Sequence, residues 1–223
     1  MRNRHLLSVA VGAILALSTL SGCSNQAPSE PATFPQTARY MSDATTPDGA
    51  AMAIGISVEG DSVAAYACNG TDDEAWFFGD QSQGGIELTS RMRDTLAAEL
   101  DGTEVTGVVT MNGVEYPFTA SPVSGLAGMY TAEADGVRAS WVVRPDGSAV
   151  GVQFSGFSQS GRDRNFDPFN LDGLTDFQVR NDVRNKRNLG PAGPIEFPDG
   201  RPKSSINGQT VTPILVTGSF RLG

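Results

Sequence analysis

The fold class is decided by the stretch Val105-Thr106-Gly107-Val108-Val109-Thr110-Met111-Asn112-Gly113-Val114-Glu115-Tyr116-Pro117-Phe118-Thr119-Ala120. Its Asn112-Gly113 dipeptide is typical of a two-residue type I′ turn, in which both central residues take a positive φ. After the turn, apolar residues recur at every second position from 114 to 120, so this half presents one apolar face. The stretch therefore predicts an antiparallel β-hairpin.

Similar runs lie on both sides of this hairpin. Apolar residues alternate over residues 52–58 before it and over residues 137–143 and 150–154 after it. Residues 62–69 are apolar on both faces, which predicts a central strand. Glycine-containing turns separate the runs at a spacing of about 8–12 residues, which is typical of a sandwich or an up-and-down barrel rather than of βαβ units.

We therefore expect an all-β fold of about nine or ten strands. It should be mainly an antiparallel meander, barrel-like or a sandwich, and the tight turns favour the barrel. One short helix is expected at residues 173–188, capped by Asp172 or Thr175 and ended by Gly190-Pro191. A closing strand is expected at residues 209–222, with a bulge or an edge position at Pro213. Residues 51–223 would then form a single β-rich domain.

Basic residues gather late in the expected helix, at Arg180, Arg184, Lys186 and Arg187. Cations near a helix C-terminus interact favourably with the helix dipole, which is one interpretation of this cluster. The cluster would alternatively dock on the acidic sheet or bind an anionic partner.

A weak calcium-loop pattern precedes the helix. Asp163, Asn165 and Asp167 place side-chain oxygens at the first, third and fifth positions of such a loop. Pro168 stands where the pattern needs glycine, and Leu174 stands where it needs a carboxylate. A solvated loop is therefore favoured over a metal site, and no other metal site is expected.

A short apolar run precedes Leu20-Ser21-Gly22-Cys23 near the start of the chain. Residues 1–5 include two arginines, and residues 6–20 carry no charge. A bilayer-spanning helix needs about 20 apolar residues, so this shorter run fits the hydrophobic region of a signal peptide. The four residues resemble the lipobox of bacterial lipoproteins. The resemblance implies removal of residues 1–22, diacylglycerol and N-acyl groups on Cys23, and anchoring at the extracytoplasmic face of the cell membrane.

Residues 23–50 are rich in proline and small polar side chains, which predicts a flexible tether after the lipidated cysteine. Arginine outnumbers lysine by 14 to 2, which indicates a GC-rich, actinobacterial source. The body also resembles uncharacterised cell-envelope β-domains of actinobacterial lipoproteins. The motifs that carry this resemblance are Tyr66-Ala67-Cys68-Asn69-Gly70, Glu74-Ala75-Trp76, Ala127-Gly128-Met129-Tyr130 and Trp141-Val142-Val143. It brings no activity with it.

Composition excludes several kinds of chemistry. The single histidine, His5, lies in the expected signal peptide, so the mature protein has no imidazole for a Ser-His-Asp or Cys-His system. Cys68 is the one cysteine left beside Cys23, and its apolar neighbours predict a buried thiol. Residues 24–160 carry 18 acidic side chains against five arginines, which disfavours a nucleic-acid partner.

Three functional hypotheses remain. The leading one is a non-enzymatic binding or scaffold module, anchored in the membrane, for an unidentified envelope protein or ligand. The second is a carrier of a lipid or another apolar ligand in a barrel pocket, lined by Trp76, Phe78, Tyr116, Phe118 and Trp141. The third is a hydrolase that uses a pair of carboxylates, which needs no histidine. No catalytic residue and no cofactor beyond the lipid on Cys23 are expected.

Overall fold

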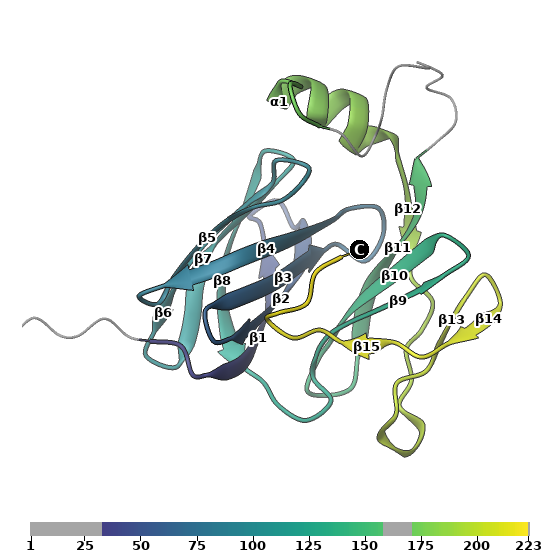
Figure 1. Cartoon of the computed structure of the whole chain (residues 1–223), viewed down its shortest axis with the longest axis horizontal. Helices are drawn as coiled ribbons and strands as arrows, with labels where there is room; N and C mark the ends of the chain where they lie inside the picture. Colours follow the sequence, from purple (N-terminus) through teal and green to yellow (C-terminus); the bar gives the residue numbers. More distant parts are fainter. Residues whose placement is uncertain (1–32, 158–170, 223) are drawn as a thin grey trace, which may run out of the picture. The chain divides into compact units, whose positions relative to one another are not determined.

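The computed structural model describes residues 33–157 and 171–222. Within these ranges, eight antiparallel strands form a closed barrel in sequence order (Figure 1). The strands are β1 (Thr37–Thr45), β2 (Ala51–Glu59), β3 (Ser62–Cys68), β4 (Glu74–Ser82), β5 (Gly85–Thr89), β6 (Thr95–Asp101), β7 (Glu104–Met111) and β8 (Val114–Pro122). The barrel closes where β8 pairs with β1, through Tyr40 with Pro122 and Met41 with Ser121.

A second antiparallel sheet packs against the barrel (Figure 1). Its order is β12-β11-β10-β9-β15, and the strands are β9 (Gly128–Ala134), β10 (Val137–Val143), β11 (Ala149–Phe157), β12 (Arg187–Pro191) and β15 (Ile214–Leu215). β13 (Ser204–Ile206) and β14 (Gln209–Val211) form a separate hairpin. Between β11 and β12 lies a helical segment of α1 (Asp176–Gln178), η1 (Val179–Val183) and η2 (Arg184–Lys186), and η3 (Pro198–Gly200) precedes β13.

The predicted hairpin is confirmed as β7 and β8. Asn112 and Gly113 have φ values of 50° and 82°, as a type I′ turn requires. Tyr116, Phe118 and Ala120 point into the barrel, whereas Val114 lies at its end and is 44% exposed. Side chains from all eight strands fill the interior, which is the usual content of an eight-stranded barrel.

The central strand predicted at residues 62–69 is confirmed as β3. Its Val63, Ala65 and Ala67 belong to the barrel core, while Tyr66 and Cys68 pack outward against the second sheet. Both faces are buried because the second sheet covers the outer face of β2, β3 and β4. The all-β class and the barrel alternative are thus confirmed, with more short strands than expected.

The tether expected at residues 23–50 is wrong for its second half. Residues 37–45 form β1, which pairs with both β2 and β8. Phe34 is also buried, with its ring 5.8 Å from that of Tyr40. Proline, serine and threonine in this stretch concealed the alternation of Ala38, Tyr40 and Ala44. Residues 20–32, including Cys23, lie outside the described residues.

The C-terminal third needs two further corrections. The expected helix is present at residues 176–186, with a capping box between Thr175 and Gln178, but it is shorter than 173–188 and mixes α, π and 3₁₀ turns. The continuous strand expected at 209–222 is replaced by β14 and β15, because Pro213 has no N–H for the ladder. Among the described residues, no helix is long and apolar enough to cross a membrane.

The buried thiol of Cys68 makes the protein sensitive to alkali. Burial raises the pKa of Cys68 to about 12, whereas an unfolded thiol titrates near pH ~8.5. Above that pH the unfolded chain loses the proton first, so the free energy of unfolding falls as pH rises toward 12. At pH ~10 this thiol should lower stability by about 2 kcal/mol.

Urea unfolding of the wild type and Cys68→Ala at two pH values, near 7 and near 10, measures this contribution. The loss of stability between the two pH values should be smaller in Cys68→Ala. Equal losses in the two proteins would show that the thiol does not titrate on unfolding. Burial also raises the pKa of Tyr66 well above its usual value, so part of the alkaline loss of stability remains in Cys68→Ala.

Candidate functional site

The candidate site is a cavity of about 360 Å³ between the barrel and the second sheet. We call it the Glu74 pocket. Its lining residues are Glu74, Ala75, Trp76 and Phe78 of β4, Thr89 of β5, Ser90, Arg91 and Met92 of the following turn, Arg138 of β10, Phe154 of β11, Arg187 of β12 and Leu222. The volume is within the range of small-ligand sites, roughly 300–1,000 Å³.

A larger groove of about 530 Å³ runs along the outer edge of β9 and β14. Its charged residues, Glu133 and Arg221, are both exposed, and so are Thr210, Thr212 and Ile214. The Glu74 pocket instead contains charged side chains that are almost wholly buried. Buried polar groups fix the orientation of a bound molecule, so the smaller cavity is the better candidate.

The outer face of β4 supplies an aromatic wall. Strand alternation sends Ala75 and Phe77 into the barrel and leaves Trp76 and Phe78 outside it. The Trp76 ring stacks on Phe78 with centroids 5.6 Å apart, and it lies 4.6 Å from the ring of Tyr66. Phe220 of the C-terminal segment covers it from another side, at 5.7 Å.

The C-terminal segment is held in place by a close approach at Gly218. A Cβ at this position would overlap the backbone of Glu59 and Ser62, so only glycine fits. Ser57 Oγ donates to the carbonyl of Val216, and Ser219 Oγ donates to Glu59. This anchoring positions Leu222 at the wall of the Glu74 pocket.

A buried ion pair forms the polar side of the pocket. The Glu74 side chain is 2% exposed and accepts hydrogen bonds on both oxygens, from Tyr66 Oη at 2.9 Å and from Arg138 Nη2 at 2.6 Å. The Arg138 guanidinium also lies 5.2 Å from the ring centroid of Phe154, its partner in the β10–β11 ladder. Burying this carboxylate is tolerable because both of its oxygens have donors.

Two donors in the pocket residues have no acceptor. Among the described residues, the buried side-chain nitrogens that lack a hydrogen-bond partner include Trp76 Nε1 and Arg138 Nε. Leaving such a group unsatisfied costs about 1–3 kcal/mol. Native proteins rarely leave such groups without a partner, and both of these belong to residues that line one cavity.

The third wall of the pocket is held by a network of buried arginines. Arg187 donates to the carbonyl of Glu74 at 2.8 Å and to Asp73 at 3.3 Å. Arg184 binds Asp73 at 2.6 Å and Asp94 at 3.2 Å, and Asp94 also accepts from the backbone N–H of Asn112. The helical segment is thereby tied to the end of the barrel.

Burial sets the direction of the pKa shifts of Asp73 and Arg187, whereas the carboxylates of Asp94 and Asp73 raise the pKa of Arg184 against the effect of its burial. Burial raises the pKa of Asp73, against the opposing effect of Arg184. Burial and the neighbouring Arg184 together lower the pKa of Arg187. Docking on acidic residues, one of the three interpretations of the basic cluster, is thus observed for Arg184 and Arg187, whereas Arg180 and Lys186 are exposed.

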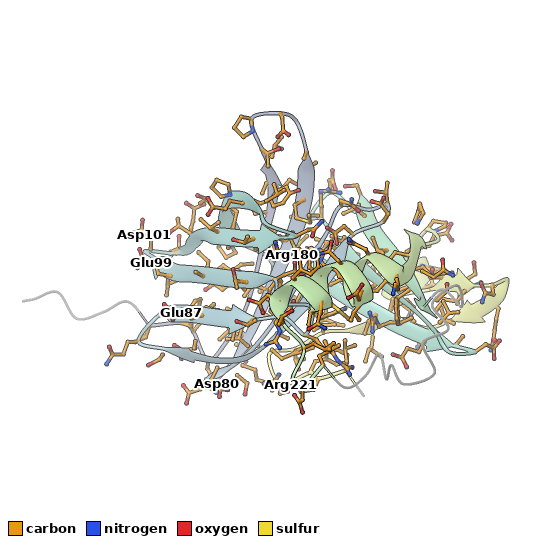
Figure 2. All side chains as sticks on the ribbon, turned by 90° about the horizontal axis from the view of Figure 1, so that it is seen from above. Asp80, Glu87, Glu99, Asp101, Arg180 and Arg221 are labelled. Atoms are coloured by element: carbon orange, nitrogen blue, oxygen red, sulfur yellow. The ribbon has the colours of Figure 1, made fainter. Side chains whose placement is uncertain are left out.

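The acidic side chains labelled in Figure 2, Asp80, Glu87, Glu99 and Asp101, come from β4, β5 and β6 of the barrel. Figure 2 shows Arg180 on the helical segment and Arg221 near Asp80, where Arg221 Nη2 donates to the carbonyl of Gly79 at 3.3 Å. The turn that contributes Ser90, Arg91 and Met92 to the pocket is at the same end as the β7–β8 turn beside Arg180. On the exposed face of β5, Glu87 is two positions from Thr89, which lines the pocket.

The expectation of one pocket lined by five aromatic residues is wrong. Trp76 and Phe78 line the Glu74 pocket, but Tyr116 and Phe118 lie inside the barrel. Trp141 lies on the far face of β10, where its Nε1 donates to the carbonyl of Gly193 at 2.8 Å. The second sheet, which local patterns do not reveal, separates these three environments.

The sequence patterns did not predict Glu74 and Arg138 as residues of a binding site. Glu74 and Arg138 are charged residues at the margins of strongly apolar strands, and such a position is itself a signal of a paired, buried charge. Asp163, Asn165 and Asp167 lie outside the described residues. The described part of the chain contains no group of three or more His, Cys, Asp or Glu that could hold a metal ion.

Searches of protein-family models, of curated proteins and of solved structures returned no match to this chain. No relative therefore supplies an activity or a ligand for the Glu74 pocket. What the pocket binds has to follow from its donors, acceptors and apolar surface.

The carboxylates do not favour the hydrolase hypothesis. A glycosidase-type site needs two carboxyl groups about 5–9.5 Å apart across the substrate. Among the described lining residues, the pocket has one carboxylate, Glu74, and the groove also has one, Glu133. Both oxygens of Glu74 are also engaged by Tyr66 and Arg138.

The arginine network predicts unequal effects of two substitutions. Arg184→Met removes one side of two buried ion pairs and should lower the free energy of unfolding by roughly 3–5 kcal/mol. Arg93→Met removes an exposed pair with Asp176, whose side chains are 41% and 79% exposed, and should change it by at most about 1 kcal/mol. Urea denaturation of both variants tests this. Equal effects would mean that the Arg184 network does not hold the helical segment.

Proposed function

We propose that this protein is a lipid-anchored protein of the bacterial cell envelope that binds a small ligand in the Glu74 pocket without transforming it. The observation that carries the proposal is the presence of two buried donors without acceptors, Trp76 Nε1 and Arg138 Nε, in residues of one cavity. A ligand with an acceptor group would satisfy them, and the aromatic wall would bury its apolar part.

The lipobox-like residues Leu20-Ser21-Gly22-Cys23 support the anchor. Two or more acyl chains on Cys23 would make a stable attachment to the membrane. Because Phe34 is buried in the barrel core and β1 begins at Thr37, the tether in this proposal ends before residue 34 and is shorter than expected. The ligand would then be bound close to the outer surface of the cell membrane.

The pocket also changes the carrier hypothesis. Side chains fill the interior of the barrel, so a carried ligand would have to sit between the barrel and the second sheet. The binding module and the carrier thus share one site in this proposal. A role as a scaffold alone would leave the two buried donors unexplained.

Native mass spectrometry of the protein released from its own membranes tests the binding function. Thr89 is exposed and lines the pocket, so Thr89→Trp should fill the cavity and abolish bound ligand. Thr119→Trp places the same side chain on the outer face of β8 and should retain it. A wild type that carries no ligand, and whose melting temperature does not respond to an extract of envelope small molecules, would refute the proposal.

The anchor is tested by Cys23→Ala. The substituted protein should be released from the membrane fraction or remain unprocessed, because the acceptor of the lipid is gone, while the β-domain still folds. Cell fractionation and intact-mass analysis measure both outcomes. Membrane association of a diacylated species in Cys23→Ala would contradict lipidation at this residue.

A further inference from the structure

We propose that the ligand of the Glu74 pocket is a small amphipathic anion, with an oxyanion head group bound by Arg138 and Trp76 and an apolar body against the aromatic wall. The inference rests on the proposed function, because it names the class of ligand for the same pocket. Carboxylates and phosphate monoesters share the required head-group chemistry.

The arrangement around Arg138 favours an oxyanion. Glu74 accepts from Arg138 Nη2 on one oxygen and from Tyr66 Oη on the other, and Arg138 Nε has no acceptor. The edge of the guanidinium formed by Nη2 and Nε is thus bound at Nη2 and has a free donor at Nε. Arginine forms its strongest contacts when two neighbouring N–H groups bind oxyanion oxygens side by side, and a ligand oxygen at Nε would complete such an edge.

Trp76 supplies the second unsatisfied donor. The residue is 7% exposed, and its Nε1 has no acceptor among the described residues. An indole N–H can only donate, so a ligand must bring an acceptor to it. A cationic head group would bring none, and it would also meet the arginines.

The charges of the lining residues also favour an anionic ligand. Three arginines and a single glutamate line the pocket in the described part of a chain whose net charge is −9. An anion is thus favoured at this position, although the protein as a whole repels anions.

The apolar body follows from the rest of the wall. Trp76, Phe78, Met92, Phe154 and Leu222 supply aromatic and aliphatic surface. At the ~30 Å³ that a water molecule occupies in the liquid, 360 Å³ holds on the order of a dozen non-hydrogen atoms. Because both unsatisfied nitrogens are shielded from solvent, a neighbouring side chain must move aside for the head group, and Met92 is the most adaptable of the wall residues.

Decanoate, decyl phosphate, decanamide and decylamine are matched probes of this size. Binding to the full-length anchored protein in nanodiscs is measured by carbon-13 NMR of labelled probes, with empty nanodiscs as the baseline for partitioning. Decanoate or decyl phosphate should bind, decanamide should bind about tenfold more weakly or less, and decylamine should not bind. The tighter of the two anions identifies the head group as carboxylate or phosphate.

Two tryptophan substitutions separate recognition from folding. Trp76→Phe removes a donor that has no partner, so it should lower anion affinity about tenfold, and it should lower the melting temperature less than Trp141→Phe, which loses the same volume. Trp141→Phe removes a donor that Gly193 satisfies, so it should lower the melting temperature and leave anion affinity unchanged.

The outcomes distinguish the two levels of the proposal. Equal affinity for decanamide and decanoate, or an unchanged anion affinity in Trp76→Phe, would overturn the oxyanion inference and leave the pocket as a binding site. Failure of all four probes, together with Thr89→Trp protein that behaves as the wild type in native mass spectrometry, would overturn the binding function itself.

Discussion

Strands β2, β3 and β4 have to bury both of their faces, and the rest of the structure follows from this requirement. Each strand sends alternate side chains into the barrel, where Ile54, Ala65 and Phe77 pack together. The side chains between them, such as Ala53, Tyr66 and Trp76, would be exposed on an isolated barrel. The second sheet covers them with Met129, Val142 and Val152, so the barrel and the sheet share one apolar interface.

The pocket forms where this apolar interface ends and charged residues begin. Glu74 and Arg138 are each located near the margin of the interface, one on each side, and each neutralises the other. Replacing a buried ion pair by well-packed apolar residues is often neutral or stabilising, so the pair is weak evidence for a purely structural role. A binding role is favoured because Arg138 Nε, in the pair, and Trp76 Nε1, beside it in the pocket lining, have no hydrogen-bond acceptor.

The arginine network serves the same region in a different way. Arg184 pairs with both Asp73 and Asp94, which fixes the helical segment on the end of the barrel. Arg187 follows directly and reaches the carbonyl of Glu74, so the wall of the pocket inherits this rigidity. A rigid wall on this side confines the adjustment on binding to the opposite side of the pocket, so less conformational entropy is lost than at a site with mobile walls.

Local sequence was sufficient to predict most of the barrel strands and their turns. Apolar alternation and Asn-Gly or Asp-Gly dipeptides are signals that extend over only a few neighbouring residues. The hairpin at Asn112-Gly113 and the doubly apolar β3 were predictable for this reason. β1 was not, because its apolar residues are small or widely spaced and its pairing with β8 joins residues about eighty positions apart. Trp76 was recognised as a candidate pocket residue, but Glu74, Arg138, Phe154 and Arg187 were not. They come from four strands of two sheets, and only the packing of one sheet on the other brings their side chains to a common cavity.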